Sequence, residues 1–122
     1  HEATPAMKTS RVRALFQHAE RRNLQPLLDF LVQRQGVKLI GKQVTNRRAP
    51  TVAFTVNGRD PADIAAQLAS RKIGIGNGNC YAYRLMGALG IQPAQGVVRT
   101  SFVHYTNEEE VSRLIGALDN IL

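Results

Sequence analysis

Apolar residues recur every three to four positions along the first third of the chain, the spacing of one face of a helix. They form two sets, Val12, Leu15, Phe16 and Ala19, and then Leu24, Leu27, Leu28, Leu31 and Val32. Thr9 or Ser10 can cap this helical segment, and Gly36 is placed to end it. Pro26 lies inside the second set, so it either kinks one long helix or occupies the first turn of a second helix.

The middle of the chain has the period of two that is typical of half-buried strands. In residues 51–56, valine and phenylalanine alternate with threonine and alanine. Shorter apolar runs at 37–40 and 73–75 predict two more strands, and residues 97–103 predict a fourth. The polar and basic segment 41–50 is expected to be a loop.

Three further helices are indicated by caps and spacing. Residues 60–61, Asp-Pro, supply a cap and a first-turn proline. The next helix is expected to begin near Tyr81 and to stop at Gly90, and the last has capping-box spacing at Thr106 and Glu109. Their expected apolar faces are Ile64, Ala65, Leu68 and Ala69, then Leu85, Met86 and Leu89, then Val111, Leu114, Ile115 and Leu118.

The element order is therefore helix, strand, strand, helix, strand, helix, strand, helix. It predicts an α+β two-layer sandwich, in which helices cover mainly one face of a small, mostly antiparallel sheet of three or four strands. Residues 9–122 are expected to form one domain. Residues 1–8 are expected to be disordered or vector-derived, with His1 as a tag remnant.

Charge adds one asymmetry, because the whole net charge of +7 falls within residues 1–50. A basic half is consistent with nucleic acid, an anionic ligand, an acidic neighbouring surface or a plain solvated surface. No apolar run is long enough to predict a membrane span. Cys80 is the single cysteine and cannot form an internal disulfide, which fits a cytoplasmic protein.

Arg99 is the most informative candidate for function. It lies in the predicted strand among valines and a phenylalanine, where a buried, unpartnered guanidinium would be costly. It either reaches the surface, pairs with a carboxylate of its own domain such as Glu108 to Glu110, or binds the carboxylate of a ligand through its two-pronged fork.

A glycine-rich stretch, GIGNGNC at 74–80, is the second candidate. It is either a bare turn or a loop that lines a ligand site, and its spacing fits neither a Walker loop nor GxGxxG. Cys80 is either a reactive thiol at a helix start or a small buried hydrophobic residue. His104 is either a site residue or structural, and no zinc-binding spacing is present.

Residues 48–91 and 96–118 resemble the C-terminal small domain of the class V aminotransferase family, closest to its cysteine desulfurase-like branch. These fold-type I enzymes use pyridoxal 5'-phosphate. The matching motifs are Arg48-Ala49-Pro50 with Phe54, Ile73-Gly74-Ile75, the loop 76–81 in which desulfurases carry their cysteine, and the stretch from Arg99 to Val111.

The resemblance implies that Arg99 holds the α-carboxylate of an amino-acid substrate and that the loop 76–81 faces this substrate. The candidate substrate-binding residues are Arg99, Asn77, Gly78, Asn79, Tyr81 and His104. An ungapped alignment through Ala82 places Tyr81, and not Cys80, at the cysteine position of the family.

Such an enzyme also needs a lysine that carries the cofactor, an aspartate for the pyridine nitrogen and a phosphate site. The family has these in a large domain that precedes this segment, and Lys8, Lys38, Lys42 and Lys72 lack a matching context. The chain is therefore expected to be a small domain without its large domain, inactive and free of cofactor alone. In the complete enzyme its partners would be the large domain and a second subunit.

Two alternatives from other classes remain. A stand-alone basic α+β module could clamp nucleic-acid phosphates with its glycine loop. However, the basic residues lie far from that loop in sequence and Phe54 and Phe102 are expected to point inward, so nucleic acid is not the expected partner. A small-ligand regulatory domain is the third alternative, and free amino acids would then raise its melting temperature.

Overall fold

The computed structural model describes residues 2–122, so His1 and its assignment as a tag remnant lie outside the described residues. The elements are α1 (Pro5–Gln33), β1 (Val37–Ile40), the 3-10 turn η1 (Thr45–Arg47), β2 (Thr51–Val56), α2 (Pro61–Ser70), β3 (Gly76–Gly78), α3 (Tyr83–Ala88), β4 (Val97–Ser101) and α4 (Glu108–Ile121). Apart from η1, this order is the predicted one. Within residues 2–122 no helix is long and apolar enough to cross a membrane.

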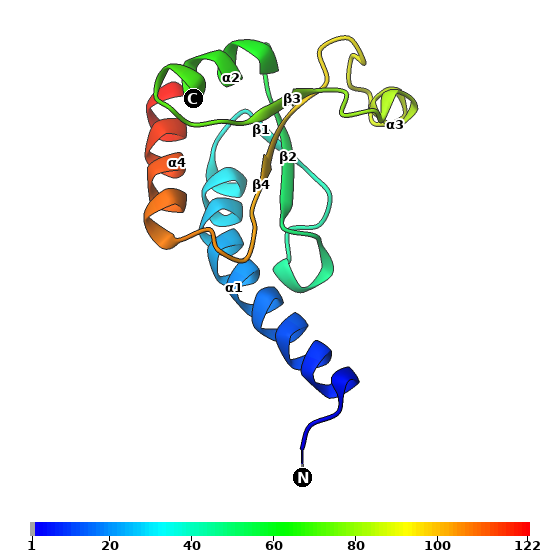
Figure 1. Cartoon of the computed structure of the whole chain (residues 1–122). Coiled ribbons are helices and arrows are strands. Elements are labelled where there is room, and N and C mark those ends of the chain that lie inside the picture. Colours follow the sequence, from blue (N-terminus) through cyan, green and yellow to red (C-terminus); the bar gives the residue numbers. More distant parts are fainter. Residues whose placement is uncertain (1) are drawn as a thin grey trace.

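The four strands form one sheet in the order β1-β2-β4-β3, and every neighbouring pair is antiparallel. Helices α1, α2 and α4 cover one face of this sheet, whereas α3 lies apart from them on the far side (Figure 1). The backbone just after α3 reaches the uncovered face, where Lys38 Nζ lies 3.5 Å from the carbonyl oxygen of Leu89. The predicted α+β sandwich, with helices mainly on one face, is confirmed.

The hydrophobic core fills the space between the sheet and the three covering helices. Its buried side chains include Leu24, Leu27, Leu28 and Leu31 of α1, Val52 and Phe54 of β2, Ile64 and Leu68 of α2, Val98 of β4, and Leu114 and Leu118 of α4. Most of the predicted apolar faces lie here. The exceptions are the exposed residues Ala69, Leu85, Val32 and, in the first half of α1, Val12, Leu15 and Phe16.

Helix α1 differs from the prediction at its start, whereas at Pro26 it follows one of the two predicted alternatives, a single long helix. It begins at Pro5 and is capped by Thr4, whose side chain accepts from the Met7 amide at 3.3 Å, so the cap predicted at Thr9 or Ser10 is wrong. Residues 5–8, expected to be disordered, are helical. Pro26 lies within a single helix that continues to Gln33. Tertiary packing of the leucines on both sides of Pro26 outweighs the one backbone hydrogen bond that a proline removes.

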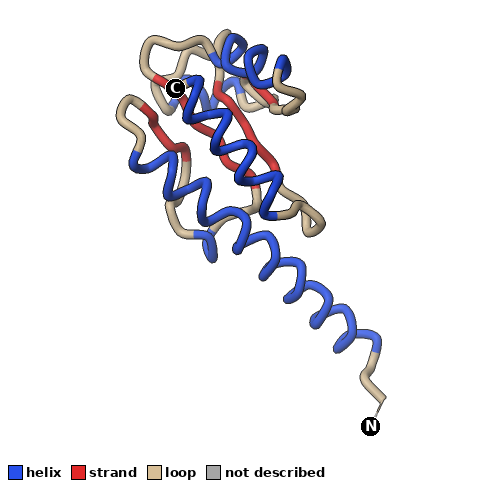
Figure 2. Tube along the Cα trace, turned by 90° about the vertical axis from the view of Figure 1, so that its left-hand side faces the viewer, coloured by secondary structure: helices blue, strands red, loops and turns tan. Residues whose placement is uncertain are grey.

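The N-terminal half of α1 extends away from the sheet and helices (Figures 1 and 2). The apolar side chains that it carries there are exposed, and they are Met7, Val12, Leu15 and Phe16. The C-terminal half packs beside α4 and supplies the buried leucines. The apolar residues of α1 thus form two surfaces. The second is buried in the core, whereas the first stays exposed even though Phe16 stacks on His104.

Two element boundaries are shifted around the glycine-rich stretch. The strand predicted at 73–75 is wrong, because β3 is formed by Gly76–Gly78. Backbone pairing with β4 needs no side chain, and Ile73 and Ile75 pack against the core as part of the preceding loop. Helix α3 begins at Tyr83 and not at Tyr81, and Gly90 follows it with a φ of 71°.

The end of β4 and the start of α4 are also shifted. The strand ends at Ser101 instead of residue 103, because Val103 donates its amide to the Thr106 hydroxyl at 3.1 Å in a turn. Thr106 is therefore not the cap of α4. Asn107 is the cap, and it forms a capping box with Glu110 instead of the predicted pair Thr106 and Glu109.

Replacing Asn107 with alanine should lower the free energy of unfolding by about 1 kcal/mol. The Asn107 side chain accepts from the Glu110 amide at 2.8 Å, and alanine would leave this amide without its side-chain partner. Denaturant unfolding measures the change, and exposed Ser112 on the same helix supplies the control Ser112→Ala. Equal stabilities of the two variants would show that the box does not contribute.

Candidate functional site

Arg99 lies on the face of the sheet that α1, α2 and α4 leave uncovered. In β4 the neighbouring residues Val98 and Thr100 are buried toward the helices, so alternation directs Arg99 to the opposite face, where it is exposed. It pairs with Ala53 of β2 on one side and with Gly76 of β3 on the other. The guanidinium of Arg99 therefore does not incur the desolvation cost that was considered for a buried arginine in this strand.

The Arg99 side chain runs across β3 at a residue that has no side chain. A Cβ atom added at Gly76 would lie 3.5 Å from Arg99 Nε and 3.6 Å from one of its terminal nitrogens. These are contact distances, so the guanidinium occupies the place next to Gly76 that a larger side chain would fill.

No carboxylate of the described residues pairs with Arg99. The ion pairs formed within residues 2–122 join Arg22 to Glu108 and Arg34 to Asp119. Glu110 accepts from the Asn107 amide as part of the capping box. Arg99 therefore does not pair with a carboxylate within residues 2–122, and the N–H donors of its guanidinium are free.

A hollow of about 400 Å³ lies in front of Arg99. It is lined by residues 76–81, Ala94 and Arg99. The structure thus brings together five of the six predicted residues, Asn77, Gly78, Asn79, Tyr81 and Arg99. Gly76 belongs to the loop 76–81 that was expected to face the substrate, and it lines the hollow as well. Ala94 was missed, because the approach of the loop around residue 94 to this site leaves no signal in the sequence.

The loop after β3 is held by its own asparagine. The Asn79 side-chain oxygen accepts from the Tyr81 amide at 3.1 Å, and its side-chain nitrogen donates to the Pro93 carbonyl at 3.4 Å. Cys80 and Tyr81 have φ angles of 52° and 62°, which are uncommon for residues other than glycine. A backbone held in this way sets the direction of both side chains.

Gly96 locks the same loop from the other side. A Cβ atom at Gly96 would lie 2.0 Å from the carbonyl carbon of Gly78 and 2.5 Å from the amide nitrogen of Asn79. Only glycine allows two backbone segments to approach so closely, and its φ of 70° also favours glycine. The hollow therefore depends on Gly96, although Gly96 does not line it.

His104 lies elsewhere, beyond the end of β4. Its ring stacks on Phe16 of α1 with 3.9 Å between centroids and 14° between planes, and Tyr105 meets it edge-on at 5.2 Å. It does not line the hollow at Arg99. His104 is close to Arg99 in the sequence but not at the hollow, because the turn after β4 brings His104 against α1.

Arg48, which belongs to the motif with Pro50 and Phe54, stabilises a loop and does not contribute to the hollow at Arg99. Its guanidinium donates to the carbonyls of Lys42 and Thr51 and so ties the loop 41–50 to β2. Partial burial lowers the pKa of Arg48 below its ordinary value, because desolvation disfavours the charged form.

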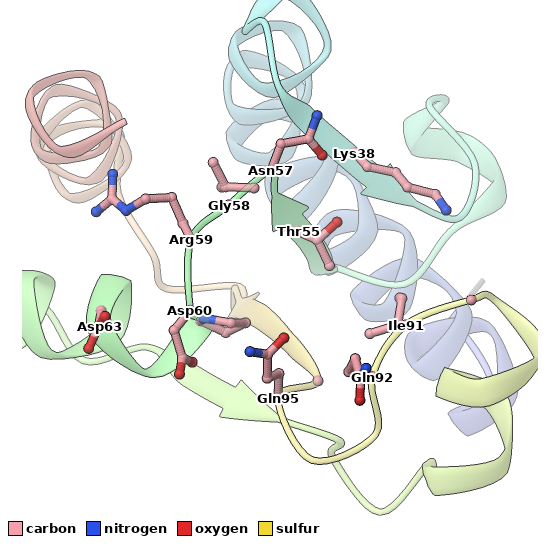
Figure 3. A pocket seen from close by; sticks show the side chains of 14 residues that line it. Lys38, Thr55, Asn57, Gly58, Arg59, Asp60, Asp63, Ile91, Gln92 and Gln95 are labelled. Carbon is pink, nitrogen blue, oxygen red and sulfur yellow. The ribbon is translucent and has the colours of Figure 1, made fainter.

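A larger hollow of about 690 Å³ lies at another end of the sheet, between the turn at 57–60, the start of α2 and the loop 90–96 (Figure 3). Two of its charged groups already have structural contacts. Arg59 donates to the carbonyl of Ile121 at 2.9 Å, and Asp60 caps α2 through the Ala62 amide at 2.9 Å. The Arg99 hollow, whose guanidinium has no such contact, is therefore the better candidate site. Within residues 2–122 no cluster of three or more metal-binding side chains occurs.

Comparison with known proteins gives one consistent family. A model described as aminotransferase class-V matches residues 7–114. An aminotransferase-like protein of Gibberella zeae is 35% identical over 99 residues, which cover 79% of this chain and 25% of that protein. A cysteine desulfurase-like protein of Aspergillus flavus is 34% identical over 101 residues, with coverage of 79% and 23%.

A solved structure shares the fold as well as sequence. The cysteine desulfurase of Thermococcus onnurineus NA1 superposes with a TM-score of 0.80 at 29% identity, over 88% of this chain and 26% of that one. The chain thus spans about a quarter of the length of each of these three proteins.

Proposed function

The chain belongs to the class V aminotransferase family, and we propose that it is the C-terminal small domain of a pyridoxal 5'-phosphate-dependent enzyme acting on an amino acid. In this proposal the domain binds the carboxylate of the substrate and helps to close the active site, and it is inactive alone. A cytoplasmic location goes with the proposal and rests on the single cysteine.

The observation that carries the proposal is the free guanidinium of Arg99 in its hollow. An arginine fork can donate two parallel hydrogen bonds to one carboxylate, which fixes both position and orientation of the bound molecule. Arg99 stands on a strand paired on both sides, so its backbone is rigid. Every α-amino acid offers a carboxylate of the required shape.

The cofactor would be held by a part of the protein outside this chain. Lysines that carry a cofactor are usually placed in a desolvated pocket. The four lysines of this chain are exposed and do not line the Arg99 hollow, and they are Lys8, Lys38, Lys42 and Lys72. The described residues therefore do not fit pyridoxal 5'-phosphate by themselves, and their proposed share is substrate binding.

The exposed apolar surface of α1 supports a large partner domain. Leu15 is 68% exposed and Met7 is 48% exposed on a helix that extends away from its own domain. Apolar patches of this kind mark surfaces that are covered in the complete protein. We propose that the cofactor-binding domain, and in a homodimer the second subunit, covers this surface, and that its basic residues face these partners and not nucleic acid.

We propose that closure follows substrate binding. When Arg99 binds the substrate carboxylate, the bound molecule connects this domain to the rest of the enzyme and favours the closed arrangement. Closure of this type excludes water and strengthens the electrostatic contacts inside the site.

Replacing Arg99 with lysine in the complete enzyme should raise KM for the amino acid about tenfold, because a point charge loses one bond of the two-bond fork. Steady-state kinetics measure this change. Arg84 is exposed on α3 and does not line the hollow, so Arg84→Lys is the matched control and should keep the KM of the unmodified enzyme. Equal KM values for both variants would contradict the proposed role.

A further inference from the structure

Two adjacent side chains at the end of the loop, Cys80 and Tyr81, differ in exposure and in direction. Tyr81 is fully exposed although it lines the hollow in front of Arg99. Cys80 is half-buried, and its sulfur lies 3.7 Å from the Gly78 carbonyl oxygen, within reach of a weak S–H···O hydrogen bond. Both residues line the hollow, but the thiol is directed to a carbonyl of its own loop, whereas the phenol is exposed.

The backbone conformation of the loop determines the outward direction of the Tyr81 side chain. A residue other than glycine is strained at positive φ, and the loop contains two such residues in succession, Cys80 and Tyr81. Asn79 compensates by accepting from the Tyr81 amide and by donating to the Pro93 carbonyl. The result is a large aromatic side chain aimed outward from a fixed point beside Arg99.

We propose that Tyr81, and not Cys80, contacts the side chain of the amino acid whose carboxylate Arg99 binds, and thereby selects the substrate. This inference rests on the proposed function of Arg99. The sequence alignment that put Tyr81 in place of the thiol is consistent with it, but the orientation of the two side chains carries the inference.

The lining of the hollow indicates which substrates Tyr81 would favour. Its side chains are the phenol of Tyr81, the thiol of Cys80, the amides of Asn77 and Asn79, the methyl group of Ala94 and the guanidinium of Arg99, and none of its residues is acidic or a lysine. A phenol donates and accepts hydrogen bonds, and its ring offers an apolar face. Amino acids whose side chains end in a hydrogen-bonding polar group are therefore favoured over aliphatic ones, and cationic side chains find no counter-charge.

The inference also predicts no covalent role for the thiol. Transfer of sulfur from cysteine through this loop would require the Cys80 thiolate to attack the substrate sulfur, so that the S–S bond of a persulfide forms while the carbon–sulfur bond of the substrate breaks and its electron pair stays on the carbon. Because the thiol turns toward the Gly78 carbonyl, we expect no persulfide at Cys80.

The experiment compares Tyr81→Phe and Cys80→Ala in the complete holoenzyme, with Tyr83→Phe as the control for an exposed tyrosine outside the hollow. Kinetics are measured with L-alanine, L-serine, L-asparagine and L-cysteine, and the enzyme incubated with L-cysteine is examined by mass spectrometry for a persulfide. Tyr81→Phe should lower the preference in kcat/KM for the polar over the aliphatic substrates about tenfold, which corresponds to one lost hydrogen bond.

Tyr83→Phe, which lies outside the hollow, should leave that preference unchanged, and Cys80 should carry no additional sulfur. A persulfide at Cys80, loss of turnover in Cys80→Ala, or an unchanged preference in Tyr81→Phe would each overturn the inference. Arg99→Lys, measured beside them, separates the two proposals. If Arg99→Lys raises KM while Tyr81→Phe has no effect, only the assignment of Tyr81 fails; if Arg99→Lys is also without effect, the proposed function fails with it.

Discussion

Replacing Gly96 with alanine should lower the free energy of unfolding of the domain by about 2 to 5 kcal/mol. Two costs add up. A non-glycine residue at positive φ loses about 1 to 2 kcal/mol, and a side chain forced into packed atoms costs about 1 to 3 kcal/mol. The second cost is large here, because the new Cβ would lie 2.0 Å from backbone atoms of Gly78, which cannot rotate away.

Gly90 provides a closely matched control for this effect. Its φ is 71° against 70° for Gly96, but a Cβ at Gly90 would meet no atom within 4 Å. Gly90→Ala should therefore show the backbone cost alone, about 1 to 2 kcal/mol. Denaturant unfolding of both variants isolates the contact between Gly96 and Gly78. Equal stabilities would mean that the loop 78–81 moves aside without cost and is not locked.

Replacing Arg99 with alanine in the complete enzyme should lower kcat/KM for the amino acid about 100-fold or more. Each hydrogen bond to a charged group contributes about 1.5 to 3 kcal/mol, and alanine removes both bonds of the fork. The stability of the domain should hardly change, because Arg99 is exposed and has no partner within residues 2–122.

This combination of large kinetic loss and unchanged stability distinguishes a ligand-binding arginine from a structural one. Kinetics and denaturant unfolding of Arg99→Ala measure the two quantities, and exposed Arg84→Ala is the control for loss of a positive charge. Arg99→Ala with wild-type kinetics would remove Arg99 from the site, and a strongly destabilised Arg99→Ala would point to a structural role.

The sequence predicted best where one local signal determines the structure. Asp60 and Pro61 start α2 as expected, since a cap and a first-turn proline act within a single turn. The outward place of Arg99 follows from alternation along β4 once Val98 is buried. These two cases need no knowledge of what lies across the fold.

The predictions that failed share one physical cause. In each case more than one local structure was compatible with the sequence, and tertiary contacts determined which one formed. β3 has no apolar pattern, because backbone pairing to β4 suffices for Gly76–Gly78. Thr106 and Asn107 are both good caps, and the turn at Val103 uses Thr106. Gly96 gave no signal because its close approach joins segments that lie 18 positions apart in sequence, at Gly78 and Gly96.

The most direct test of the role of Arg99 compares an amino acid with its carboxamide in the complete enzyme and in Arg99→Ala. The amide keeps the size of the carboxylate but cannot accept both bonds of a guanidinium fork. We expect the unmodified enzyme to bind the acid about 100-fold more tightly than the amide, and Arg99→Ala to bind the two equally. A preference for the acid that persists in Arg99→Ala would contradict the assignment of Arg99 as the carboxylate-binding residue.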